Sequence, residues 1–148
     1  MTPEDFAHWN RREIPRAGDL VLTREAPMGN VCILPEGLQV CLTQRLMLMR
    51  TDNEFIDRRF VLHFLNSLHF KAQVLDRCRG LTTPHIRVKD VPTFLMPLAR
   101  REEQRRIVAY LDTQKANIDA LTHLQAETTA ELDALLPSIL DKAFKGEF

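Results

Sequence analysis

The sequence predicts an α+β fold: a small mixed or antiparallel β-rich domain with a packed helix, followed by one long C-terminal helix of coiled-coil type. Three observations support this prediction. Short apolar runs separated by Pro and Gly fill residues 19–50, apolar residues recur at helical intervals over 54–77, and residues 101–136 contain neither Gly nor Pro. We therefore expect a domain at 1–98 and a helical region at 99–148.

The N-terminal residues 1–18 are polar and carry Pro3, Pro15 and Gly18, which favours a loop or a short helix. Four short β-rich runs follow, and they predict three or four strands at 19–25, 30–34, 38–42 and 45–50. No helical segment separates consecutive runs, so no parallel crossover is possible and the sheet should be antiparallel.

A helix is expected next, because residues 51–54 have the spacing of a capping box. Apolar residues then follow at helical spacing, so this helix should span about 54–77 and pack on the sheet. They are Ile56, Phe60, Phe64, Leu68, Ala72 and Leu75. Residues 94–98 read as a short apolar strand that leads into the long helix, with a domain boundary near Ala99.

The long helix carries a narrow apolar seam with a period near 3.5 residues. Such a seam needs a second long helix as its partner, and the simplest source is a second chain. Polar seam residues should set the register of pairing, and Pro137 should end the helix before a last amphipathic turn closed by Gly146. The a positions are Leu111, Ile118, Gln125 and Leu132, and the d positions are Ile107, Gln114, Leu121, Thr128 and Leu135.

Composition and motifs limit the classes of function that the sequence can support. Lys plus Arg and Asp plus Glu both number 20, so the net charge gives no reason to expect a nucleic acid. The three cysteines lack the paired spacing of a zinc site and indicate buried, reduced thiols in a cytoplasmic protein. No apolar run is long enough to cross a membrane. Nucleotide-binding, nucleophile and metal motifs are absent, so we expect no enzyme activity, no cofactor and no metal.

Basic residues concentrate around one loop, at 77–89. Charged side chains there neutralise phosphates, and short hydrogen-bonding side chains can approach base edges, which points to DNA. An ordinary solvated loop is the alternative. The candidates in the loop are Arg77, Arg79, Thr82, Thr83, His85, Arg87 and Lys89, and Arg24 and Arg45 near strand ends would extend the patch. Arginines at 100–106 oppose the dipole of the helix start, which suggests a partner or a phosphate there, or a solvated face.

The long-helix region resembles a known family. Its run MPLARREEQRRIVAYLDTQKANIDAL and the closing SILDKAFKGEF are similar to the conserved region of the specificity subunit of type I restriction-modification systems. The residues that carry the resemblance are Glu103–Gln104, Ile107, Leu111–Asp112 and Ile118–Asp119. Upstream, residues 13–34 and the turn at 80–83 resemble the later part of that family's target-recognition domain.

The resemblance implies a non-catalytic reader of double-stranded DNA. In the family, long helices separate two recognition domains and dock the methyltransferase subunits, through which the restriction subunit joins. This chain has one recognition domain and one helical region, and sequence that usually opens the domain is missing before Met1. We therefore expect a half-length or truncated form that pairs as a homodimer or with another specificity subunit. The alternative is an interaction protein that pairs through its helix without binding DNA.

Overall fold

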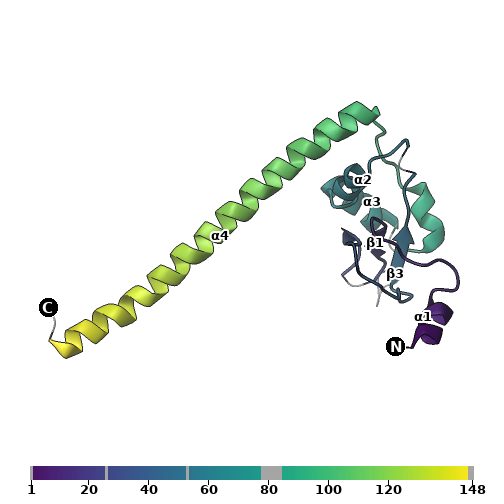
Figure 1. Cartoon of the computed structure of the whole chain (residues 1–148). Helices are drawn as coiled ribbons and strands as arrows, with labels where there is room; N and C mark the ends of the chain where they lie inside the picture. Colours follow the sequence, from purple (N-terminus) through teal and green to yellow (C-terminus); the bar gives the residue numbers. More distant parts are fainter. Residues whose placement is uncertain (1, 26, 53, 78–84, 147–148) are drawn as a thin grey trace. The chain divides into compact units, whose positions relative to one another are not determined.

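The computed structural model describes residues 2–25, 27–52, 54–77 and 85–146. The chain folds as two units, Met1–Val108 and Ala109–Phe148. The first unit contains a sheet, several short helices and the beginning of the last helix, α4, and the second unit is the remainder of α4 (Figure 1).

The sheet has three strands: β1 (Leu20–Thr23), β2 (Val31–Ile33) and β3 (Leu46–Met49). The central strand β1 pairs antiparallel with both neighbours, with Val21 opposite Cys32 on one side and Leu48 on the other. Side chains of β1 are buried on both faces of the sheet, because Leu20 and Leu22 on one face are fully buried and Val21 on the other is only 6% exposed. The predicted antiparallel sheet is confirmed.

The possible fourth strand at 38–42 does not form, and these residues are irregular. The Val40 carbonyl instead accepts a hydrogen bond from Asn10 Nδ2 at 3.3 Å, so a side chain takes the place of a strand neighbour. The prediction that the thiols are buried is also wrong for the two described cysteines: Cys32 on β2 is exposed, and Cys41 is half-buried and accepts a hydrogen bond from Asn10 Nδ2 at 3.4 Å. Cys78 lies outside the described residues.

The single helix predicted at 54–77 is wrong at its start and in its middle. The structure has two helices, α2 (Arg58–Leu65) and α3 (Leu68–Arg77). The first is capped by Asp57, whose carboxylate accepts from Arg59 N. The Asp52 side chain, in the segment that was expected to start the helix, instead accepts from Glu54 N at 3.0 Å ahead of α2. The break follows from Ser67, whose hydroxyl accepts from Phe70 N and so caps a new helix.

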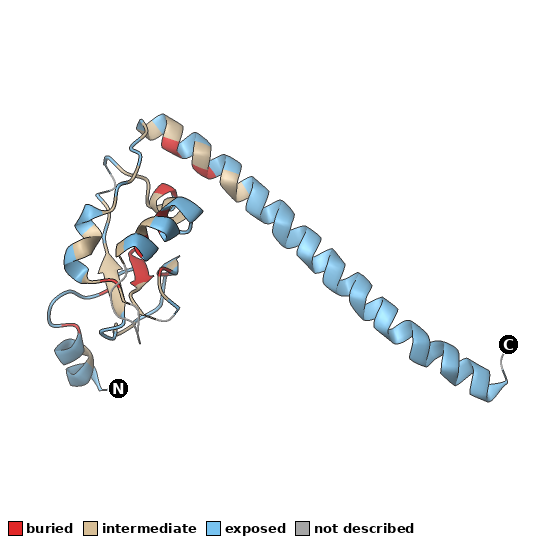
Figure 2. Ribbon diagram, turned by 180° about the vertical axis from the view of Figure 1, so that it is seen from behind, coloured by how far each residue is buried: buried red, intermediate tan, exposed pale blue. Residues whose placement is uncertain are grey.

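The core lies between β1, α2 and α3. Leu22 of β1 packs with Leu65 of α2, with Phe70 and Val74 of α3, and with Ile86. Buried residues gather on these elements, whereas the later turns of α4 are exposed along their whole length (Figure 2). The segment after Ile86 forms a 3₁₀-helix, η1 (Val88–Thr93), and completes one wall of the core.

The apolar strand predicted at 94–98 is also wrong. Gln73 of α3 uses its side-chain amide for both backbone groups of Leu95, donating to the carbonyl at 2.8 Å and accepting from the N–H at 2.9 Å. Phe94 meanwhile packs edge-on against Phe70, with ring centroids 4.9 Å apart. The segment is therefore held by side chains of the domain and not by a sheet.

The N-terminal residues form the short helix α1 (Pro3–Trp9), one of the two predicted outcomes. A capping box starts it: Asp5 N donates to Thr2 Oγ1, and Thr2 N donates to the Asp5 carboxylate, both at 3.1 Å. The chain then returns to the sheet beside Arg50, which binds Asp19 through two hydrogen bonds of 2.7 Å. Arg50 also binds Glu13 at 2.6 Å, so one guanidinium ties the N-terminal segment to the strands β1 and β3.

The last helix, α4 (Arg101–Lys145), confirms the predicted long helix but not its predicted end. It continues through Pro137, whose ring removes one backbone donor without ending the helix. The helix ends at Lys145, and the next residue, Gly146, has φ of +70°, a conformation that glycine adopts readily. The added turns extend the helix by the residues that were predicted to form a separate tail.

Candidate nucleic-acid interface

Arg24, directly after β1, forms hydrogen bonds with two segments that carry predicted DNA contacts, one at Arg45 and one that begins at His85. Its backbone N–H donates to the Arg45 carbonyl at 2.8 Å, and its carbonyl accepts from Ile86 N at 2.9 Å. Its guanidinium donates to the Ile86 carbonyl at 2.9 Å and to the Gln44 carbonyl at 2.6 Å. The structure therefore brings Arg24, Arg45 and the segment that begins at His85 together where the central strand β1 ends, and we call this surface the Arg24 edge.

The other predicted side chains differ in how far their charge is compensated. Arg45 lies 3.3 Å from Glu25, and Arg87 lies 3.5 Å from Asp90. Lys89 is exposed on η1. Arg77 stacks over the Phe94 ring at 5.4 Å and donates to the Gln73 carbonyl, so it is placed by α3 and not by the Arg24 edge. The remaining candidates, Arg79, Thr82 and Thr83, lie outside the described residues.

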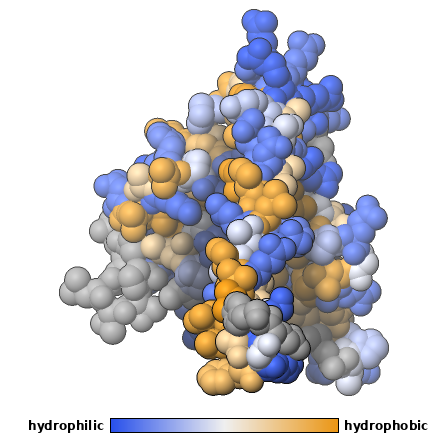
Figure 3. Space-filling view, turned by 90° about the vertical axis from the view of Figure 1, so that its left-hand side faces the viewer, coloured by the Kyte–Doolittle hydropathy of each residue, from blue (hydrophilic) through white to orange (hydrophobic). Residues whose placement is uncertain are grey.

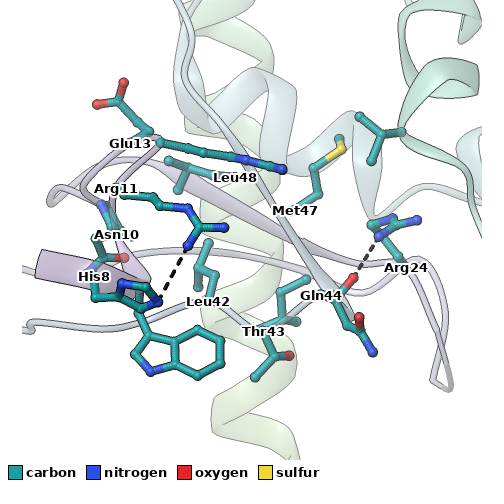
Figure 4. Close-up of a pocket in the computed structure, with 15 residues that line it drawn as sticks. His8, Asn10, Arg11, Glu13, Arg24, Leu42, Thr43, Gln44, Met47 and Leu48 are labelled. Carbon is teal, nitrogen blue, oxygen red and sulfur yellow. Dashed lines mark hydrogen bonds between the residues drawn. The ribbon is translucent and has the colours of Figure 1, made fainter. Parts of the chain in front are cut away.

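A cleft of about 800 Å³ opens beside Arg24. In Figure 4, His8 and Arg11 lie on one side of it and Arg24 and Gln44 on the other, with Leu42 and Leu48 in the region between them. Trp9 and Arg12 also line it. His8, Trp9, Arg11 and Arg12, which line the cleft in and just after α1, were not among the predicted DNA contacts. The consecutive Arg11 and Arg12 could have suggested a phosphate contact from the sequence alone. Nothing in the sequence indicates that they lie near Arg24.

The predicted seam of α4 is largely uncovered within the described chain. Every residue from Thr113 to Gly146 is exposed, and Leu121, for example, is 59% exposed (Figure 2). Ile107 and Leu111 are half-buried near the start of the helix. The exposed seam residues are Gln114, Ile118, Leu121, Gln125, Thr128, Leu132 and Leu135, and further exposed apolar residues are Leu124, Leu136, Ile139 and Leu140.

Gln104 of the predicted Glu103–Gln104 pair has a structural role at the start of α4. Its side chain is fully buried and makes three hydrogen bonds. Oε1 accepts from Asp57 N at 2.8 Å, and Nε2 donates to the Ala99 and Phe55 carbonyls at 2.8 and 3.3 Å. The first turn of α4 is thus fixed to the N-terminus of α2 within the first unit.

The two units carry opposite charge. Residues 1–108 contain 17 Lys and Arg against 13 Asp and Glu, a net charge of +4, and residues 109–148 contain 3 against 7, a net charge of −4. The net charge of the whole chain is zero because the charges of the two units cancel, and the first unit by itself is basic. A basic domain is electrostatically complementary to a polyanion.

Apolar side chains also reach the surface, where they interrupt the hydrophilic regions (Figure 3). Leu68 and Leu75 are exposed two turns apart on α3, although the same helix buries Phe70 and Val74. No group of acidic, His or Cys side chains among the described residues could hold a metal ion. The described helices include none that is both long and apolar enough to span a membrane.

Comparison with known proteins identifies a family. The model of the type I restriction modification DNA specificity domain matches residues 3–130. The specificity subunit of the type I restriction enzyme EcoBI from Escherichia coli is 24% identical over 137 residues, which is 93% of this chain and 29% of that subunit.

Two solved structures share the fold. The HsdS subunit from Thermoanaerobacter tengcongensis is 28% identical with a TM-score of 0.67, over 82% of this chain and 32% of that one. A chain in "Structural basis underlying complex assembly and conformational transition of the type I R-M system" is 36% identical with a TM-score of 0.75, over 90% of this chain and 32% of that one.

The chain thus spans less than a third of the length of these three relatives. The matched residues include nearly all of the first unit and more than half of the second. The predicted resemblance is confirmed, and the chain belongs to the family of type I restriction modification DNA specificity domains.

Proposed function

We propose that this chain is a DNA-recognition and scaffolding component of a type I restriction-modification system, and that it catalyses no reaction itself. The observation that carries the proposal is the family match across residues 3–130, which includes the basic domain and most of the seam of α4. In this proposal the domain recognises double-stranded DNA, and the helix α4 assembles the chain with its partner subunits. Such a component works in the cytoplasm, where the DNA is.

The charge of the domain supports DNA contact. Arg24, Arg45 and the segment from His85 to Lys89 meet at one edge, and the first unit has a net charge of +4. Arginine and lysine supply phosphate contacts, which fix the register of a protein on a duplex, while shorter polar side chains read base edges. The Arg24 edge is therefore our proposed DNA-facing surface.

The exposed seam supports pairing. A helix whose apolar residues are uncovered from Ile118 to Leu135 gains stability when a second helix covers them. We propose that the partner is a second copy of this chain or another specificity subunit. The paired helices then dock methyltransferase subunits, and the restriction subunit joins through these. If two copies pair by a two-fold axis, their target is a palindrome split by a spacer.

Binding of duplex DNA across a salt series tests the proposal. We expect log K to fall linearly with log salt, and the Arg87→Ala/Lys89→Ala variant to reduce the slope by about 2 because two phosphate contacts are lost. The particle mass, measured on the same samples, should not change. The exposed Lys71→Ala on α3 is the control for nonspecific loss of charge.

A second function is favoured by the exposed seam of α4, which calls for a partner helix and not for DNA. The chain would then pair through α4, and exchange with longer specificity subunits, without contacting DNA. A folded dimer that binds no duplex even at low salt would establish this second function and exclude the first.

A further inference from the structure

We propose that the cleft beside α1 grips the sugar-phosphate backbone of the DNA. Arg11, Arg12 and Arg24 contact successive phosphates there, and Trp9 packs against deoxyribose. This inference rests on the proposed function and adds a second contact surface to the Arg24 edge. It extends the DNA contact from the end of β1 to residues near the N-terminus.

The first argument is electrostatic. None of the three arginines forms an ion pair with a carboxylate among the described residues. Glu13, the acidic residue of the lining, is occupied by Arg50 at 2.6 Å. The positive charge of the cleft is therefore uncompensated, which is the state expected of a site that receives an anion.

The second argument is the placement of Arg24. Its guanidinium is half-buried and is held by two neutral carbonyl acceptors, those of Ile86 and Gln44. Because both acceptors are neutral, neither offsets the charge of the guanidinium, and the conformational entropy of ordering this side chain has already been lost in folding. Arg24 is thus preorganised for a phosphate at the cleft mouth.

The third argument is the combination of an aromatic ring with hydrogen-bonding side chains. Trp9, the last residue of α1, is 66% exposed although it is the largest apolar side chain in the chain. Thr43 and Gln44, which also line the cleft, carry side-chain donors of the kind that bind phosphate and sugar oxygens. Aliphatic Leu42 and Leu48 line the region between the two walls. These residue types fit a sugar-phosphate strand.

The fourth argument is continuity. Val88 lines the cleft and belongs to the segment that carries His85, Arg87 and Lys89. The cleft and the Arg24 edge therefore share residues and form one surface of the first unit. A duplex that contacts the Arg24 edge passes the cleft, where contacts to phosphate add affinity without adding sequence preference.

Trp9 makes this inference directly testable, because it is the only tryptophan in the sequence. The full-length chain is titrated with short duplexes of several sequences while Trp9 fluorescence is recorded, and binding is measured independently by a label on the DNA. We expect the emission of Trp9 to change to saturation with every sequence and to follow the binding curve of the labelled DNA.

The Arg11→Ala/Arg12→Ala variant tests the charges. It should bind all duplexes about 10-fold more weakly at low salt and lower the slope of log K against log salt by about 2, with the ratio between sequences unchanged. Lys71→Ala, which removes an exposed charge that does not line the cleft, should leave the Trp9 response unchanged. Both variants change exposed side chains, and thermal melting verifies that they fold.

Three outcomes overturn the inference in distinguishable ways. If DNA binds while Trp9 emission stays constant and the double variant binds as wild type does, the cleft is not a DNA site and the proposed function stands. If the folded dimer binds no DNA, the proposed function and the cleft assignment both fall. If Trp9 responds to poly-glutamate and not to DNA, the cleft binds an acidic peptide.

Discussion

Residues 1–108 bury a core around Phe70 and Leu22, whereas the helix from Thr113 to Gly146 buries no residue within the described chain. The two regions also carry net charges of +4 and −4. Both contain apolar side chains at regular spacing, but only the domain covers its own. The domain therefore derives its stability from its own packing, and we propose that the helix gains part of its stability from a partner helix.

The largest effect is expected from breaking the seam. Leu121→Glu places a charge at its centre, and burying that charge in a helix pair is unfavourable, so pairing should be abolished. Sedimentation should show a particle of half the mass, and helical content should fall. Ala120→Glu adds the same charge one residue outside the seam and should leave the mass unchanged. A paired Leu121→Glu variant would show that the seam is not the interface.

The complementary change tests the domain. Phe70→Ala removes a fully buried ring that contacts Phe64 and Phe94, and should destabilise the first unit by about 4 kcal/mol. Chemical denaturation followed by the Trp9 signal measures the loss. The exposed Leu75→Ala on the same helix is the control and should cost less than about 1 kcal/mol. Equal losses in the two variants would contradict the core described above.

A smaller effect is expected where the domain meets α4. Gln104→Leu leaves Asp57 N and the Ala99 carbonyl without their partner, which should cost about 2 to 3 kcal/mol in the free energy of unfolding. Asn117→Leu is the matched control, because Asn117 carries an exposed amide on the same helix and lies outside the seam. If the two substitutions were equally mild, Gln104 would not anchor the start of the helix.

The smallest effect depends on pH. Hydrogen bonds from Arg50 hold the pKa of the buried Asp19 carboxyl below its usual value, against the opposing effect of burial. A lowered folded-state pKa gives stability that is present above about pH 4 and is lost as the pH falls through the lowered value. Asp19→Asn should therefore cost about 2 kcal/mol at neutral pH and progressively less in acid.

Urea unfolding of wild type and Asp19→Asn over a range of pH measures this difference. The control is Asp76→Asn, whose carboxylate is largely exposed on α3, so its stability should follow wild type at every pH. A difference between wild type and Asp19→Asn that stays constant into acid would show that the Arg50 pair does not cause the pH dependence.

Errors in the sequence prediction have identifiable causes. The apolar pattern over 54–77 is continuous, so it predicted one helix, but the hydroxyl of Ser67 caps a second helix start. The apolar run at 94–98 matched a strand, yet Gln73 from another element satisfies the backbone of Leu95. In both cases the apolar pattern was identified correctly, but hydrogen bonding by a single polar side chain determined a different backbone structure.

The sequence by itself determined the local elements: the three strands, the long helix without glycine and the period of its exposed seam. These follow from side-chain spacing and turn residues, which act over a few positions. Only the tertiary structure placed Arg24 against Ile86, 62 residues away, opened a cleft between Arg24 and Arg11, and buried Gln104. Such pairings depend on how the core packs, and no local period records which distant carbonyl a guanidinium will reach.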